Sequence, residues 1–204
     1  MIGRRQFLIA SASLIAMPAL VPRLAFAAPG APETVKGFYD VLTATMKDGQ
    51  KLGFAGRRDR IAPALAQAFD LPQMTRLAVG PRWSGLTPQQ QSDLIAAFGA
   101  YSAATYANRF ADYSGEHFEV DTNTTPSGDA VIVHSKLVRK SGDPVQLDYL
   151  LKQSGGAWKI VDVYVSGTVS ELATRRSEFS AVLNRGSAPA LIDELHKKSV
   201  EQKS

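Results

Sequence analysis

The chain has 204 residues, of which 45% are hydrophobic and 21% are charged, and it contains no cysteine. Its formal net charge is +4, but removing residues 1–27 takes away three arginines and no acidic side chain, leaving 20 basic and 19 acidic side chains. This balance excludes nucleic acid as a partner, because a nucleic-acid binder needs a concentrated basic surface. The lack of cysteine excludes disulfides, thiol catalysis and cysteine-based metal sites.

The N-terminal segment has the layout of a secretory signal peptide. Arg4 and Arg5 precede a run of about 15 mostly apolar residues, and Ala25-Phe26-Ala27 supplies the small residues of a cleavage site. We therefore expect cleavage after Ala27, a mature protein in the bacterial periplasm, and a single domain over residues 28–204. The stretch Arg-Arg-Gln-Phe-Leu also resembles the twin-arginine export signal. Both this route and the general export route remain open.

The first half of the mature chain is predicted to be helical. Apolar residues spaced three to four apart indicate one helix over 34–49 and another over 61–69. A glycine-containing loop is expected over 49–56, followed by a solvated charge cluster at 57–60. Asp70, followed by Pro72, is predicted to cap a short third helix.

A capping box and a change of periodicity define the rest of the fold. Thr87-Pro88-Gln89-Gln90 predicts the start of a long helix that extends toward Phe110. Beyond His117 the apolar period changes to two, and turn residues separate the alternating runs, which predicts an antiparallel meander. The four expected strands cover 118–122, 131–137, 145–151 and 158–164, and two closing helices cover 172–183 and 191–195. The fold class is therefore predicted to be α+β.

Sequence motifs for enzymatic chemistry are absent. The chain has no G-x-S-x-G nucleophile elbow, no S-x-x-K motif and no glycine-rich phosphate loop. His117 and Glu119 could share a strand face, but two ligands do not make a zinc site. Asp162 lies in an otherwise apolar strand and is predicted to be structural, paired with an arginine (175, 176 or 82) or capping a helix. A general-base role for Asp162 stays open as the alternative.

Two long stretches resemble one known family. Residues 69–110 are similar to the "FD…M…R…LG…W…T…Q" segment of the MlaC/toluene-tolerance family, and residues 155–195 resemble its C-terminal "W-K-[IV]-x-D-V…G-[VI]-S…R-S-x-F" signature. The phrase Gly-Thr-Val-Ser at 167–170 is most similar to the hopanoid-associated HpnM branch. The matching positions are Asp70, Met74, Gly80, Trp83, Trp158, Asp162, Ser170, Arg176, Ser177 and Phe179.

The resemblance implies a soluble periplasmic lipid carrier. Its fold would be an NTF2-like core, in which helices flank a twisted four-stranded antiparallel sheet and enclose a deep apolar pocket for lipid tails. Its ligand would be a hopanoid or a phospholipid, and its partners an inner-membrane lipid transporter complex and an outer-membrane lipoprotein complex. Neither a catalytic step nor a cofactor is implied. An isomerase or hydrolase that uses Asp162 as base, or an adaptor without a ligand, remains an alternative.

The expected pocket wall combines the alternating strands with the aromatic residues of the long helix. An apolar hollow between a curved sheet and a helical layer can bind an apolar ligand. The candidate lipid-binding residues are Leu77, Trp83, Phe98, Tyr101, Val133, Leu147, Tyr149, Ile160, Tyr164 and Phe179.

Overall fold

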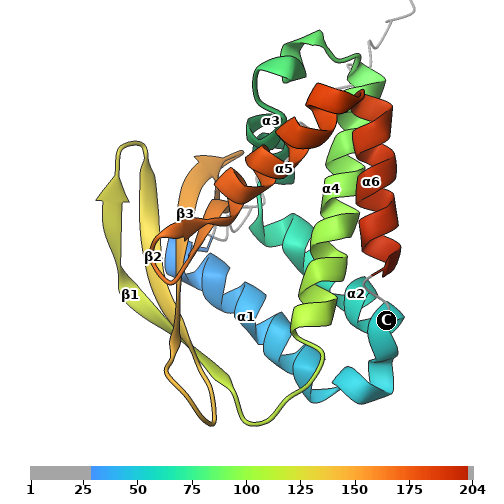
Figure 1. Ribbon diagram of the computed structural model, residues 1–204. Helices are drawn as coiled ribbons and strands as arrows, with labels where there is room; N and C mark the ends of the chain where they lie inside the picture. Colours follow the sequence, from blue (N-terminus) through green and yellow to red (C-terminus); the bar gives the residue numbers. More distant parts are fainter. Residues whose placement is uncertain (1–28, 202–204) are drawn as a thin grey trace, which may run out of the picture.

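The computed structural model describes residues 29–201, and in this part of the chain six α-helices lie on one side of an antiparallel sheet (Figure 1). The predicted α+β class is confirmed. The expected signal peptide, residues 1–27, lies outside the described residues. None of the helices in the described part of the chain has the length and hydropathy that a membrane span requires.

The helical layer is built from two segments of the chain. Helix α1 lies against the sheet, α2 and α6 pack on either side of the long α4, and α5 contacts α3 (Figure 1). The bounds are α1 Ala31–Lys47, α2 Gly49–Ala68, α3 Leu71–Val79, the 3₁₀ helix η1 Gly80–Gly85, α4 Pro88–Arg109, α5 Glu171–Arg185 and α6 Ala188–Glu201.

The predicted capping box opens α4. The Thr87 hydroxyl accepts a hydrogen bond from the Gln90 backbone N–H at 3.2 Å, and the Gln90 side chain accepts one from the Thr87 N–H at 3.0 Å. Two otherwise unpaired backbone donors are thus satisfied at the start of the helix. Helix α4 ends at Arg109 with Phe110 as its C-cap, close to the predicted limit.

The loop predicted over 49–56 is wrong, because α2 already begins at Gly49. Its regular course is interrupted at Gly53, whose φ of 59° and ψ of −179° lie in a region that only glycine adopts readily. The expected charge cluster at 57–60 is also only partly solvated. The Arg57 guanidinium donates to the carbonyls of Ala107 and Gly49, and so ties α2 to the end of α4.

The sheet has five strands rather than the predicted four. The strands are β1 His117–Ser127, β2 Ala130–Val138, β3 Val145–Ser154, β4 Ala157–Val165 and β5 Val169–Ser170. They pair antiparallel in chain order, β1-β2-β3-β4-β5. Sequence periodicity could not indicate β5, because its two residues are too few to alternate. This short strand connects the end of β4 to the start of α5.

An irregularity in β4 decides which residues face the helices. Leu150 pairs with Asp162 but Leu151 pairs with Ile160, so β4 carries one extra residue at this point. Such a bulge shifts the phase of the alternation. Ile160 therefore shares the buried face of Leu151, whereas Tyr164 lies opposite Asp148 on the other face of the sheet. Ile160 and Tyr164 were both expected in the pocket wall, and the bulge places them on opposite faces of the sheet, so this expectation is wrong for Tyr164.

Candidate functional site

An apolar cavity of about 110 Å³ lies between the buried face of the sheet and helices α3, α4 and α5. Most of its wall is hydrocarbon. The aromatic members are Phe69, Phe98, Tyr101, Tyr106, Phe110 and Tyr149. The aliphatic members are Leu65, Leu71, Met74, Leu147, Val163, Val165 and Leu172. The polar members are Ser102, Thr105, Arg109, Glu171 and Arg175.

The tyrosines deep in the wall add no charge at neutral pH. Burial raises the pKa of Tyr149 and that of Tyr106 well above the usual value for a phenol. The Tyr106 ring packs edge-to-face against Phe38 at a centroid distance of 5.2 Å, and it stacks with Phe110 at 5.8 Å. These tyrosines therefore present uncharged rings, and together with the aliphatic chains they make most of the wall apolar, which favours an apolar guest.

The charged wall residues come from one end of α4 and the first turns of α5. Arg175 donates to Glu178 at 2.8 Å and to Glu171 at 3.3 Å, and its guanidinium lies 5.1 Å from the Tyr101 ring centroid. Burial alone would lower the pKa of Arg175, but Tyr101, Glu178 and Glu171 more than offset this, so that its pKa is raised. Arg109 lies 3.5 Å from the other oxygen of Glu171. We call Arg109, Glu171 and Arg175 the rim of the cavity.

Asp162 fixes the start of α5 and so positions the rim. Its carboxylate is buried and accepts hydrogen bonds from the Ser170 hydroxyl at 2.6 Å and from the Leu172 backbone N–H at 3.0 Å. It also accepts one from the N–H of Val163 at 2.7 Å. Of the two structural roles predicted, helix capping is the one observed, and the hydrogen bonds of the described residues pair Asp162 with no arginine. Asp162 does not line the cavity.

The structure brings four of the ten candidate lipid-binding residues together in the cavity wall, namely Phe98, Tyr101, Leu147 and Tyr149. Three others are core residues behind the wall, namely Val133, Ile160 and Phe179. The ring of Phe179 packs edge-to-face against Phe98 at 5.7 Å and so supports the wall from outside. Whether a lipid contacts any of these residues stays a prediction.

The remaining three candidates lie away from the cavity. Tyr164 is on the far face of the sheet because of the bulge in β4. Leu77 is 44% exposed on α3, and Trp83 in η1 lines a surface recess beside it. Apolar character made these residues candidates, but it could not indicate which side of the wall each one occupies.

Sequence reasoning missed much of the wall. Tyr106 and Arg109 follow Phe98, Tyr101 and Thr105 on one face of α4, and this spacing of three to four residues could have identified them. Phe69 carried no such signal. It is the C-cap of α2, and it reaches the cavity because its neighbour Asp70 donates a backbone hydrogen bond to the Ile160 carbonyl at 2.9 Å.

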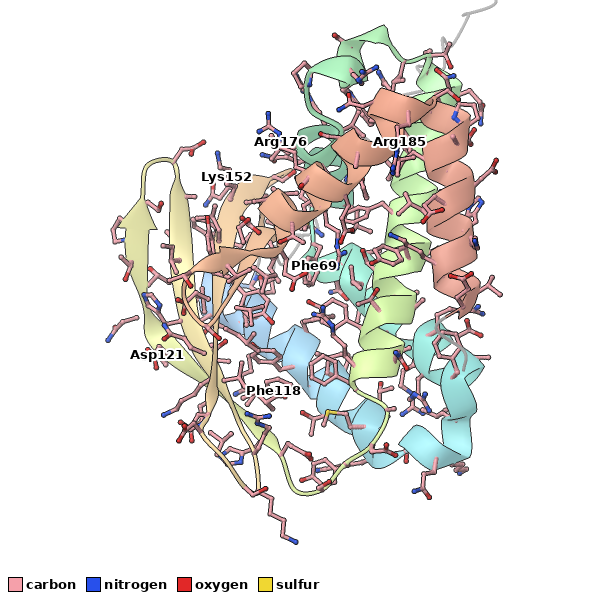
Figure 2. All side chains as sticks on the ribbon, viewed as in Figure 1. Phe69, Phe118, Asp121, Lys152, Arg176 and Arg185 are labelled. Atoms are coloured by element: carbon pink, nitrogen blue, oxygen red, sulfur yellow. The ribbon has the colours of Figure 1, made fainter. Side chains whose placement is uncertain are left out.

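The histidines form no metal centre in the part of the chain that the structure describes, where no three potential ligands converge. His117 lies 3.3 Å from Glu119 on an exposed strand end, as the sequence suggested. His134 and Asp148 form a separate pair at 2.9 Å on the face of the sheet away from the helices. Figure 2 shows the side chains that crowd the space between the sheet and the helices, with Phe69 among those at its centre.

Comparison with known proteins places this fold and cavity in a family. The profile of the MlaC protein family matches residues 36–197. The chain belongs to the MlaC family. The MlaC resemblance noted in the two sequence motifs is thereby confirmed, and it extends across the helices, the sheet and the cavity between them.

One solved structure of similar fold is informative. It is a phospholipid-binding protein from Ralstonia solanacearum, determined in complex with a phospholipid. That MlaC-like chain is 26% identical to this one, with a TM-score of 0.74, and the match covers 86% of this chain and 100% of the other. None of the curated proteins compared with the chain is a significant match.

Proposed function

We propose that this protein is a periplasmic lipid carrier that holds the apolar tails of a lipid in the cavity between the sheet and α3, α4 and α5. The observation that carries the proposal is the composition of the cavity wall, in which aromatic and aliphatic side chains make up 13 of the 18 lining residues. Membership of the MlaC family and the similarity to a phospholipid-bound protein support it.

Physical chemistry explains why such a carrier is useful. At ~0.8 kcal/mol per buried CH₂ group, exposing one long lipid tail to water costs on the order of 12 kcal/mol. A protein wall that replaces the bilayer around the tails removes most of this cost, and no covalent step is needed. The cavity of about 110 Å³ is smaller than the ~150 Å³ cavity that holds one benzene molecule. The wall must therefore widen when a tail enters.

The rim favours a lipid with an anionic headgroup. Arg175 is held between the carboxylates of Glu171 and Glu178, so its charge is already balanced. Arg109 lies 3.5 Å from Glu171 and its side chain is 56% exposed, which leaves it as the guanidinium of the rim that can bind a headgroup. Guanidinium groups bind phosphate oxygens by charge-assisted hydrogen bonds. A phospholipid fits this rim better than an uncharged hopanoid does. The hopanoid-associated branch stays the competing assignment.

The decisive experiment compares two charged substitutions. Leu147→Arg places a cation in the cavity wall, whereas Val200→Arg places one on an exposed position of α6. Both proteins are purified from the native host, checked for cooperative melting and extracted for lipid analysis. We expect near-stoichiometric lipid in the wild type and in Val200→Arg, and a loss of at least tenfold in Leu147→Arg, because a buried cation cannot be solvated among tails.

A second variant covers the case in which Leu147→Arg does not fold. Ser102→Trp adds a large ring at a half-buried position of the cavity wall and fills space that a tail would use.

Added phospholipid at about 100 times Kd should raise the Tm of the wild type by roughly 5–10 °C. Hopanoid should raise it less. A wild-type protein without lipid, whose Tm neither lipid changes, would refute the carrier function.

Export and partners complete the proposal. Cleavage after Ala27 should give a mature protein that begins at Ala28 in the periplasmic fraction. Replacing Arg4 and Arg5 by lysine should block export by the twin-arginine route, and undiminished export would assign the general route. An inner-membrane transporter complex and an outer-membrane lipoprotein complex would load and unload the carrier, which crosslinking in the periplasm can test.

No observation in the described residues favours the enzymatic alternative. A general base has to reach its substrate, but Asp162 lies outside the cavity lining and its oxygens are occupied by Ser170, Leu172 and Val163. Turnover that disappears in a stably folded Asp162→Asn protein would revive that alternative.

A further inference from the structure

A basic and partly apolar surface lies on α3, η1 and α5, away from the cavity interior. We call it the basic patch, and it consists of Arg76, Leu77, Arg82, Trp83 and Arg176. Helices α3 and α5 contact each other, and Arg176 lies where α5 passes α3 (Figure 2). A Cβ added at Gly80 would lie 3.7 Å from Arg176 Nε, and Arg82 donates to Asn184 of α5 at 3.0 Å. Arg76, Leu77 and Trp83 therefore line one recess, and Arg82 and Arg176 lie beside it where η1 and the end of α3 meet α5.

The arginines of the basic patch are free of carboxylate partners. Arg76, Arg82 and Arg176 are exposed, and none of them forms an ion pair with any residue in the range 29–201. Elsewhere in residues 29–201, eight of the sixteen other arginines and lysines form ion pairs, Arg58, Arg60 and Arg175 among them. Asp70 lies in the same recess and keeps its negative charge while it accepts from the Gln73 backbone N–H, so the three arginines leave a net charge of +2 at this surface.

Apolar side chains lie between these charges. Leu77 is 44% exposed, although α3 has buried positions on its other side. Trp83 lines the same surface recess together with Leu77, Arg76 and Pro72. Arginine, tryptophan and leucine at one surface are the residue types that place a protein at the boundary between lipid headgroups and acyl chains.

The basic patch lies on the reverse side of the cavity wall. On α3, Leu71 and Met74 face the cavity while Arg76 and Leu77 face outward. On α5, Leu172 and Arg175 line the cavity while the neighbouring Arg176 is on the patch. A surface bound to the patch would therefore touch the two helices that separate it from the cavity.

We infer that the basic patch docks the protein on the surface of a bilayer that contains anionic phospholipid. This deepens the proposed function, since a lipid carrier has to meet a membrane when it collects or delivers its load. Unpaired arginines attract the anionic surface, while Leu77 and Trp83 insert at the headgroup level. An acidic protein would use the same charges, but it would not require the exposed leucine and the tryptophan to enter hydrocarbon.

The test uses the mature protein and sedimentation with vesicles. We expect the wild type to bind vesicles of 30% phosphatidylglycerol in phosphatidylcholine, and to bind pure phosphatidylcholine at least tenfold more weakly. The triple variant Arg76→Gln, Arg82→Gln, Arg176→Gln should lose about fivefold in affinity for each arginine, on the order of a hundredfold in total. The control Lys51→Gln, Lys140→Gln, Lys197→Gln removes the same charge from exposed positions elsewhere and should bind like the wild type.

Tryptophan fluorescence separates docking from a diffuse charge effect. The chain has two tryptophans, so Trp158→Phe leaves Trp83 as the single reporter. Its emission should shift to the blue when anionic vesicles are added, and Leu77→Asn should weaken this binding severalfold. Equal losses in the patch and control triples, or no shift of Trp83, would overturn the inference. A protein that carries lipid but does not bind vesicles would refute docking and leave the carrier function standing.

Discussion

Asp162 offers the sharpest test of how the cavity wall is held in place. Its carboxylate accepts the Ser170 hydroxyl, the Val163 N–H and the Leu172 N–H, which belongs to the first turn of α5. In Asp162→Asn one acceptor oxygen remains, but the charge at the N-terminus of α5 and one charge-assisted hydrogen bond are lost. Charge near a helix N-terminus contributes ~0.3–1 kcal/mol, and the net value of a hydrogen bond is ~1 kcal/mol. We expect the free energy of unfolding to fall by about 1–2 kcal/mol.

Truncation should cost more than amide replacement. Asp162→Ala leaves the Leu172 N–H and the Ser170 hydroxyl without their partner in a buried site, so we expect a loss of about 3 kcal/mol. Urea unfolding monitored by circular dichroism measures both values, and Asp193→Asn on the exposed side of α6 is the control. If Asp162→Asn is as stable as the control, the capping role is refuted.

Three further predictions concern a helix cap, a backbone conformation and a buried tyrosine. Thr87→Ala removes one half of the capping box of α4 and should lower the free energy of unfolding by about 1 kcal/mol in urea titrations, while α4 keeps its register. Gly53→Ala should lower the free energy of unfolding by roughly 1–3 kcal/mol, because the φ of Gly53 is positive. Gly37→Ala within α1 should leave it unchanged or raise it, and equal effects of the two substitutions would contradict the role given to the positive φ. Burial raises the pKa of Tyr39 to about 12 in the folded protein, so the unfolded chain loses the phenol proton at a lower pH than the folded protein does. The free energy of unfolding should therefore fall between pH 10 and 12, and it should fall less steeply with pH in Tyr39→Phe.

The sequence predicted the elements better than their faces. The capping box, the four long strands and the MlaC resemblance each rest on local signals, namely the types of residue and their spacing within a short stretch of the chain. The fifth strand and the bulge in β4 are different. Both depend on how one strand pairs with another, and the phase of Ile160 and Tyr164 cannot be known before that pairing is set.

The same limit applied to the cavity. Phe98 and Tyr101 were identified because they lie on one periodic face of α4, and Leu147 and Tyr149 because they alternate in β3. Leu77 and Trp83 are equally apolar but lie outside the wall, since α3 and η1 present them to the surface. A filled core, a hollow core and an exposed apolar surface need the same residue types, and only the placement of the helices distinguishes them.

The arrangement of α5 suggests which wall moves when a tail enters the cavity. Helix α4 packs against α2 and α6, and the strands are joined by continuous hydrogen-bonded pairing, so displacing either disrupts many interactions. Within its 15 residues α5 buries only Phe179 and Leu183. Its N-terminus is anchored by Asp162, and its first turns carry the rim. The α5 residues that line the cavity lie beside this anchor, so a pivot about it would leave them in place. We therefore expect the first turns of α5 to shift away from the sheet when a tail enters, with Phe179 and Leu183 staying buried.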